Sequence, residues 1–321
     1  MECVELGKSD LKVSRIGLGA MQFAPAWIGD KEMMKKVLAC ALDNGINFID
    51  TAERYGLGMS ETVIGETIMD RGDRDDLVIV TKVSLIHLRY KDVIKAAEAS
   101  LKRLQTDVID LYQIHAPSCY VPTSETMKAM DWLLKEGKVR YVGLSNYPVC
   151  RTREAIECLK NGDIITNQLE YSVVMRDIEA EMLPFLRETG IVTIAYSPLA
   201  MGILTGKYVE TTEIPKEDPR LGDPLFKNGE NLGSVQPVIS LMREIAEAHE
   251  ATVAQVALNW LLRFDDVFPI PGAKTPEQVE SNINATKWKL SEEEWNRITE
   301  ASDELDLNFF LDFGRFLDSS Q

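Results

Sequence analysis

Four ionisable side chains stand where predicted strands end. Asp50 closes the second predicted strand and Tyr55 follows it. Lys82 ends the third strand, and His115 ends the fourth. A phenol has a reference pKa of ~10 and donates its proton poorly at neutral pH, but a nearby ammonium group favours the phenolate. A carboxylate can hold that ammonium group in place, and an imidazole can orient a carbonyl oxygen. Such a set is suited to protonating an oxygen that gains negative charge.

An oxygen gains charge in this way when hydride reaches the carbon to which it is bound. No side chain supplies hydride, so this chemistry requires a cofactor. Taken singly, each of the four residues has an ordinary structural interpretation: a helix N-cap, a surface lysine, a structural hydrogen-bonding histidine and a packing tyrosine. Delivery of all four to one face by successive strands favours the chemical interpretation.

The elements that must position these residues alternate between short apolar strands and amphipathic helices. The predicted strands are Ile16–Leu18, Asn47–Asp50, Leu77–Thr81, Val108–Ile114, Val139–Leu144, Ile165–Gln168, Ile191–Ala195 and Val267–Phe268. The clearest predicted helices are Lys31–Asn44, Ser60–Met69, Lys91–Leu104, Thr123–Glu136 and Val149–Leu159. Strand starts near 46, 77, 108 and 139 recur every 31 residues, which is the length of one βα unit.

Eight such units predict an α/β fold, a (β/α)8 TIM barrel, preceded by an N-terminal β-hairpin over residues 1–15. The active site of such a barrel lies at the carboxyl ends of its strands. A doubly wound sheet is the alternative, but the stretch from Gly17 to Gln22 lacks the third glycine of a dinucleotide-binding fingerprint.

Composition limits the domain organisation and the partners. The chain has 321 residues and a net charge of −16, and we expect one barrel domain over residues 1–321. Residues 202–234 are too polar for core and form a candidate lid or cofactor loop, with a disordered surface excursion as the alternative. Residues 304–321 form a C-terminal tail. The acidity argues against nucleic acid and anionic membranes. Five cysteines without CxxC spacing, and a start without a signal peptide, predict a cytoplasmic protein.

Four motifs in order resemble the signatures of the aldo-keto reductases. They are the segment 47–56 (NFIDTAERYG) followed by Ser60-Glu61, then 80–82 (VTK), 110–115 (DLYQIH) and 143–146 (GLSN). The resemblance runs from the hairpin to about residue 300. It implies a barrel enzyme that reduces aldehydes or ketones with a nicotinamide cofactor. Tyr55 is then the general acid, Lys82 paired with Asp50 lowers its pKa, and His115 orients the carbonyl.

The resemblance also implies a cofactor site along the strand ends. Ser145, Asn146 and Gln168 would hold the nicotinamide carboxamide, and the ring of Tyr196 would stack on the nicotinamide. Without the family context, Ser145 and Asn146 read as turn caps and Tyr196 as a packing aromatic. The remaining expected cofactor contacts are Gly19, Ala20, Met21, Asp50, Ser197, Pro198, Leu199, Gly202, Leu204, Lys207 and Arg220.

The stretch after the eighth strand departs from the best-known family pattern. Gly272-Ala273 stand where that pattern has Lys-Ser, Gln278 where it has Arg, and Ser281 where it has Glu, whereas Asn282 is retained. We expect Gly272, Lys274, Gln278 and Asn282 to contact the cofactor. Lys207, Arg220, Lys274 and the helix after Pro276 would form a basic island for its phosphates. NADPH is the expected cofactor, with NAD use possible.

A small carbonyl compound is the expected partner, and its identity is left open, as is the oligomeric state. Met21, Trp27, Tyr55, Ile86 and His115 are the expected substrate contacts. Phe23 and Tyr120 are further pocket candidates, and residues 308–313 could cover either the pocket or an oligomer surface. Each apolar candidate has an alternative role in loop packing.

The alternative function is an NADP-binding sensor with little turnover, since potassium-channel beta subunits resemble these reductases. Three other enzyme classes lack their signatures in this sequence. None of the nine tyrosines has lysine four positions on, no HxH or HExxH is present, and GxSxG is absent. No metal site is expected.

Overall fold

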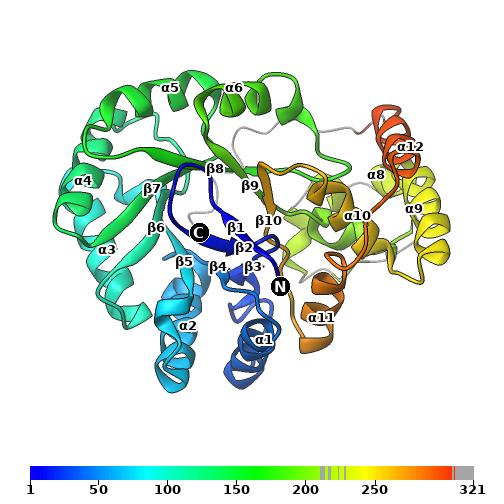
Figure 1. Ribbon diagram of the computed structural model, residues 1–321, viewed down its shortest axis with the longest axis horizontal. Helices are drawn as coiled ribbons and strands as arrows, with labels where there is room; N and C mark the ends of the chain where they lie inside the picture. The colour runs from blue at the N-terminus through cyan, green and yellow to red at the C-terminus, as the bar shows by residue number, and fades with distance from the viewer. Residues whose placement is uncertain (210–213, 216–217, 223, 228, 306, 308–321) are drawn as a thin grey trace.

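The computed structural model describes residues 1–209, 214–215, 218–222, 224–227, 229–305 and 307. Eight parallel strands lie side by side in chain order and the helices surround them (Figure 1). The strands are β3 (Leu18–Gly19), β4 (Phe48–Asp50), β5 (Val78–Val83), β6 (Ile109–Ile114), β7 (Val139–Ser145), β8 (Ile164–Glu170), β9 (Val192–Tyr196) and β10 (Val267–Pro269). All eight predicted strands are thereby confirmed, most within two residues of their expected bounds.

The five helices expected from periodicity are also present. They are α1 (Lys31–Asp43), α2 (Met59–Arg71), α3 (Tyr90–Leu104), α4 (Thr123–Lys135) and α5 (Val149–Cys158). Five further helices of at least eight residues follow within the described residues: α6 (Met182–Thr189), α9 (Gln236–Ala248), α10 (Val253–Leu262), α11 (Pro276–Asn284) and α12 (Glu292–Asp303). Within the described residues, no helix is both long and apolar enough to span a membrane.

The first and last strands meet and close the barrel. Backbone N–H groups of Gly17 and Gly19 donate to the carbonyls of Pro269 (2.9 Å) and Pro271 (3.1 Å), and a parallel bridge joins Gly19 to Gly272. A Cβ at position 19 would collide with the carbonyl oxygen of Ile270, so this seam requires glycine. The closed ring excludes the doubly wound alternative.

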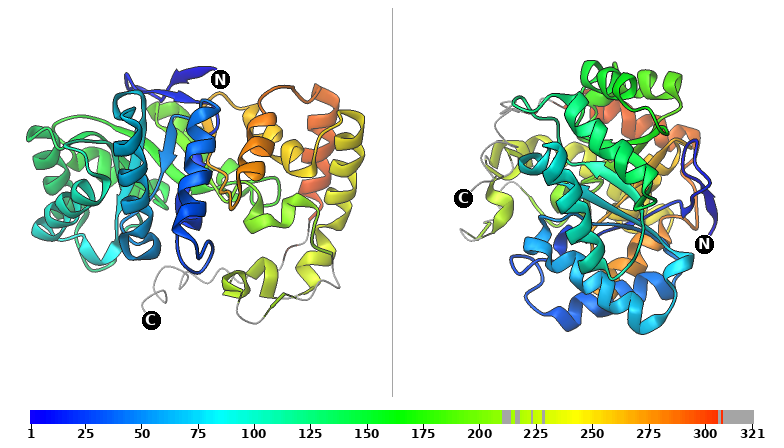
Figure 2. Two further views of the ribbon diagram at one scale, coloured as in Figure 1. Left: turned by 90° about the horizontal axis from the view of Figure 1, so that it is seen from below. Right: turned by 90° about the vertical axis from the view of Figure 1, so that its left-hand side faces the viewer.

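The N-terminal hairpin covers the amino ends of the barrel strands. Its strands β1 (Cys3–Glu5) and β2 (Lys12–Ser14) pair antiparallel, as predicted. Leu6, Leu11 and Val13 are buried in one cluster with Phe48 and Phe268 of the strands. In the left view of Figure 2 the hairpin lies at the top and the yellow-green helices of residues 219–234 lie at the bottom, on the opposite side.

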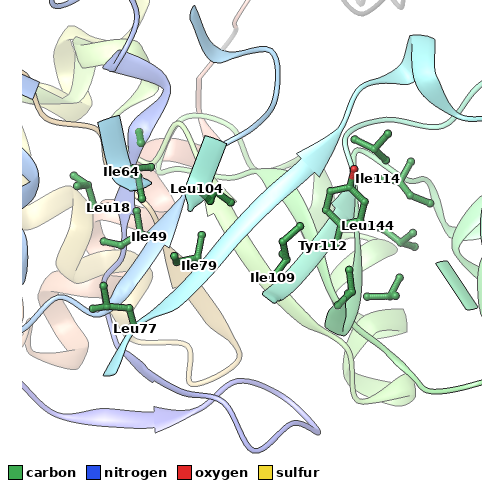
Figure 3. Close-up of a cluster of buried hydrophobic side chains, with 14 of the residues drawn as sticks. Leu18, Ile49, Ile64, Leu77, Ile79, Leu104, Ile109, Tyr112, Ile114 and Leu144 are labelled. Carbon is green, nitrogen blue, oxygen red and sulfur yellow. The ribbon is translucent and has the colours of Figure 1, made fainter. Parts of the chain in front are cut away.

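A second apolar layer lies between the strands and the outer helices. Figure 3 shows Ile49 and Ile79 of the strands beside Ile64 of α2 and Leu104 of α3. Strand residues face alternately inward and outward. Packing on the outer face therefore leaves the alternate side chains of each strand directed to the barrel interior.

The segment 202–234 differs from its prediction. It contains the short helices η6 (Ala200–Thr205, which begins just before it), η7 (Pro219–Gly222), α7 (Pro224–Lys227) and α8 (Gly229–Ser234). The expectation that it is too polar for core is wrong for Leu225, Phe226 and Leu232, which are buried in one cluster with Ile239 of α9. These few apolar side chains turn inward although the segment as a whole is rich in charged residues. The aromatic stretch 308–313 lies outside the described residues.

Candidate active site

The predicted catalytic side chains meet at the carboxyl end of the barrel. Lys82 Nζ, at the end of β5, lies 2.6 Å from Asp50 Oδ1, at the end of β4, and 3.5 Å from the hydroxyl of Tyr55. It also donates to the carbonyl oxygen of Thr51 at 2.8 Å. The ring of His115 lies edge-on to that of Tyr55, with centroids 5.9 Å apart. The structure therefore brings all four groups into one cluster.

Gln168 holds the buried ion pair from across the barrel, and Gln113 supports Gln168. Gln168 Nε2 on β8 donates to Asp50 Oδ2 at 2.7 Å and also contacts Gln113 Oε1 at 3.1 Å. Gln113 Nε2 in turn donates to Thr166 Oγ1 at 3.0 Å. Because Asp50 accepts from both Lys82 and Gln168, its carboxylate has little freedom to rotate.

The electrostatics of the pair differ from the expectation. Lys82 and Asp50 are almost wholly removed from water. Burial raises the pKa of Asp50 and lowers that of Lys82, and each charge opposes the shift of the other. The pair carries no net charge whichever partner holds the proton. It therefore presents little net positive charge to the phenol nearby.

The pKa of Tyr55 is raised above its usual value, first by burial and then by the charge of Asp50. The expectation that Lys82 lowers this pKa is wrong for the structure described here, because Asp50 neutralises the ammonium group and the phenol is desolvated. Tyr55 consequently remains a protonated phenol across the physiological pH range.

His115 is held in its neutral form. Burial, and then the positive charges of Lys82 and Arg54, lower its pKa to about 3. A neutral imidazole offers one N–H donor and one nitrogen acceptor. His115 can therefore orient a carbonyl oxygen by a hydrogen bond without itself acting as a strong acid.

Strained loop residues brace the same rim. Asn146, directly after β7, has φ 59°, and Ser197, after β9, has φ 49°; both lie in the left-handed region that few residues other than glycine adopt. Asn146 is held there by donating to the carbonyl of His115 (3.0 Å) and by accepting from the hydroxyl of Tyr196 (2.9 Å). The strand ends of β6, β7 and β9 are thereby tied together.

A cavity of about 610 Å³ opens above this cluster. Most of the predicted site residues line it: Gly19, Met21, Trp27, Asp50, Tyr55, His115, Ser145, Asn146, Gln168, Tyr196, Ser197, Pro198, Leu199, Gly202, Arg220, Gly272, Lys274 and Gln278. Lys82 is not among them because it lies fully buried behind Tyr55 and Asp50.

Other predicted contacts lie elsewhere. Ala20 and Leu204 are fully buried in apolar clusters, and Asn282 lies beneath the loop, with Nδ2 3.5 Å from the carbonyl oxygen of Gly272. Lys207 is exposed and does not line the cavity, so the basic island is smaller than expected.

Three substrate-pocket candidates are also misplaced. Phe23 is fully buried in the core, whereas Ile86 and Tyr120 are 58% and 84% exposed and lie outside the cavity lining. These residues were predicted from their places in loops near the barrel rim, and such a place does not determine whether a side chain faces the cavity.

Several lining residues were missed. They are Gln22, Glu170, Met201, Thr205, Tyr208, Pro219, Ile270, Pro271 and Ala273. The sequence could have predicted Glu170, because it stands two residues after Gln168 on β8 and alternate strand residues face the same side. Nothing in the local sequence predicts Tyr208 as a lining residue, since its position depends on how the chain around it folds.

The end of the cavity away from Tyr55 carries the cationic side chains Arg220 and Lys274. Arg220 Nη2 forms an ion pair with Asp218 Oδ2 at 2.5 Å, and its Nη1 donates to the hydroxyl of Tyr208. Lys274 Nζ lies 4.7 Å from the ring centroid of Trp27. Burial, and then the charge of Arg220, lower the pKa of Lys274.

Helix α11 begins beside these cations. Gln278 Oε1 accepts from the backbone N–H of Lys274 at 2.8 Å, and Thr275 caps the helix. The arrangement offers two cations and a helix N-terminus to an anionic group. Within the described residues, no group of three His, Cys, Asp or Glu could hold a metal ion.

Fold and site together define a (β/α)8 barrel with a buried phenol, a lysine–aspartate ion pair and a neutral imidazole at the carboxyl ends of its strands. The family model described as the Aldo/keto reductase family matches residues 15–303, and the chain therefore belongs to that family of NAD(P)H-dependent oxidoreductases.

Individual relatives agree with this assignment. An uncharacterized oxidoreductase of Mycobacterium tuberculosis is 39% identical, over 91% of this chain and 90% of its own. The NADH-specific methylglyoxal reductase of Escherichia coli is 32% identical, over 95% of this chain and all of its own. The crystal structure of an aldo-keto reductase from Klebsiella pneumoniae in complex with NADPH has a TM-score of 0.75 and 32% identity, covering 93% of this chain and 94% of that one.

Proposed function

We propose that this protein reduces aldehydes or ketones to alcohols with NADPH, and that Tyr55 donates the proton. The observation that carries the proposal is the position of the Tyr55 hydroxyl, 3.5 Å from the buried Nζ of Lys82 and on the wall of the cavity. A phenol with this neighbour and an adjacent neutral imidazole is an arrangement for protonating a reduced carbonyl oxygen.

The residues present fit a nicotinamide cofactor. The hydroxyl of Ser145 and the amides of Asn146 and Gln168 lie at the Tyr55 end of the cavity and match the donor and acceptor of a carboxamide. The Tyr196 ring offers a stacking surface, and Arg220 and Lys274 would hold phosphate at the far end. When bound, the cofactor supplies the hydride.

Each member of the cluster has a separate task. His115, neutral above about pH 3, donates a hydrogen bond to the substrate carbonyl and fixes its direction. Tyr55 keeps its proton until negative charge develops on that oxygen, because its raised pKa prevents earlier ionisation. Lys82 Nζ, 3.5 Å from the Tyr55 hydroxyl, can then donate a hydrogen bond to the phenolate left behind. Asp50 holds Lys82 in place, and Gln168 holds Asp50.

The test is NADPH consumption with a panel of aldehydes and ketones that includes 4-nitrobenzaldehyde and methylglyoxal. Tyr55→Phe removes the proton donor and should lower kcat by a factor of about 10²–10⁴. Tyr120→Phe makes the same chemical change at a side chain that is 84% exposed and outside the cavity, and it should leave kcat unchanged.

Two outcomes would contradict the proposal. Equal activity of Tyr55→Phe and the parent protein would remove Tyr55 from the proton donation. Tight cofactor retention without turnover of any carbonyl compound would instead favour the NADP-binding sensor.

A further inference from the structure

We infer that Asp218 sets the preference between NADPH and NADH, by neutralising Arg220 at the place where the extra phosphate of NADPH would bind. The inference rests on the proposed function, because it requires that a nicotinamide dinucleotide occupies the cavity. It concerns a residue that does not itself line the cavity and that acts through its neighbour.

The guanidinium group of Arg220 is already engaged. Its Nε donates to Asp218 Oδ1 at 2.8 Å and its Nη2 to Asp218 Oδ2 at 2.5 Å, so the contact is bidentate. Its Nη1 donates to the hydroxyl of Tyr208. The group also lies over two aromatic rings, 5.0 Å from the centroid of Tyr208 and 5.3 Å from that of Phe226. Arg220 is therefore fixed in place, with Asp218 as its bidentate counterion.

The charge available to a phosphate is correspondingly small. Arg220 and Lys274 carry two positive charges and Asp218 carries one negative charge, so the three side chains leave a net charge of +1. Asp218 is only 15% exposed, so solvent screens its charge incompletely. A phosphomonoester near neutral pH carries between one and two negative charges. The cluster therefore compensates a phosphomonoester incompletely.

NADPH differs from NADH by one phosphate group, which replaces a neutral hydroxyl on the adenosine ribose. A negative charge beside the site of that group penalises NADPH and leaves NADH almost unaffected. Arg220 and Lys274 are the cationic side chains among the described residues that line this end of the cavity, so the charge of Arg220 matters there. Asp218 is thus placed to reduce selectivity for NADPH without touching the reacting atoms.

The test compares the dissociation constants of NADPH and NADH for the full-length protein and for Asp218→Asn and Asp218→Ser, measured by cofactor fluorescence. Both variants remove the charge, and they differ in side-chain shape. Each should tighten NADPH binding by roughly three- to tenfold, the size of one partly screened charge contact, and change NADH binding by less than about twofold. Glu280→Gln removes one charge from an exposed position on α11 and should change neither constant.

The possible results are distinguishable. Weaker NADPH binding in both variants would overturn the inference, because Asp218 would then serve to orient Arg220. Equal tightening of NADPH and NADH would also overturn it, because Arg220 would face the pyrophosphate that both cofactors share. If the parent protein binds neither cofactor, the proposed function itself fails. Thermal unfolding of each variant shows whether the variant is folded.

Discussion

Asp50 and Lys82 form a buried ion pair, with Oδ1 and Nζ 2.6 Å apart and side-chain exposures of 2% and 0%. Neither charge reaches bulk water, so each depends on the other for compensation. The pair supports the neighbouring phenol, and its disruption has consequences for both stability and activity.

Lys82→Met should destabilise the protein by about 3–5 kcal/mol at neutral pH, because it leaves the Asp50 carboxylate buried without its partner. The double variant Asp50→Asn/Lys82→Met should recover part of that loss, since it removes the uncompensated charge. Neither Lys82→Met nor the double variant should reduce carbonyl compounds, because both lack the Lys82 ammonium group. Chemical denaturation measures the free energy of unfolding of each variant. If the double variant is no more stable than Lys82→Met, the unpaired charge of Asp50 is not the cause of the destabilisation.

The low pKa of His115 makes stability depend on pH. Its pKa in the folded protein is about 3, below the ordinary histidine value of 6.5, so the unfolded chain binds the proton more readily. The neutral side chain's contribution is therefore complete above pH 6.5 and is lost as the pH falls toward 3. His115→Asn should lose this acid sensitivity. The free energy of unfolding of the parent minus that of the variant should be larger at neutral pH than between pH 3 and 6.5. A difference that does not depend on pH would argue against a buried neutral imidazole.

Tyr196→Phe removes the hydroxyl that donates to Asn146 at 2.9 Å. Asn146 has a left-handed backbone and loses one of the bonds that hold it, at a cost of about 1 kcal/mol. We expect cofactor binding to weaken by roughly fivefold while the phenyl ring keeps its stacking surface. Tyr196→Ala should weaken binding further. Equal affinities for Tyr196→Phe and the parent would show that the hydroxyl plays no part.

The hairpin should contribute to stability and not to catalysis. Leu11→Ala removes a side chain that is 2% exposed and packed among barrel residues, which costs about 2–5 kcal/mol. The hairpin and the helices of residues 219–234 lie at opposite ends of the barrel (Figure 2), so kcat at low temperature should be unchanged. Met69→Ala, at a side chain 60% exposed, should change stability by no more than about 0.5 kcal/mol. A loss of kcat in folded Leu11→Ala would contradict this separation.

The sequence predicted the barrel because its strands are short apolar runs that alternate with amphipathic helices, four of them starting 31 residues apart, and these signals are local. It also predicted that Asp50, Tyr55, Lys82 and His115 converge, because parallel strands end at the same rim. The direction of the Tyr55 pKa shift was not predictable, because it depends on burial and on the balance between two opposite charges. Neither quantity is encoded in the spacing of the residues.

The loops account for most of the other differences. Phe23 turns into the core, whereas Ile86 and Tyr120 turn outward, and nothing in their immediate sequence distinguishes them. Leu225 and Phe226 are buried although charged residues surround them in the sequence, because α9 offers an apolar surface that is adjacent only in space. The pairing of Arg220 with Asp218 was equally hidden, since i, i+2 neighbours in an irregular segment have no fixed relative orientation.

The bridge between Gly19 and Gly272 joins strands from opposite ends of the chain, and both glycines line the cavity. A molecule bound there contacts both sides of the seam at once. Such a ligand would stabilise the closed barrel. At free concentration [L] and dissociation constant Kd, it would raise the free energy of unfolding by RT ln(1 + [L]/Kd). Without the bound molecule, the contact between Gly19 and Gly272 would open more readily.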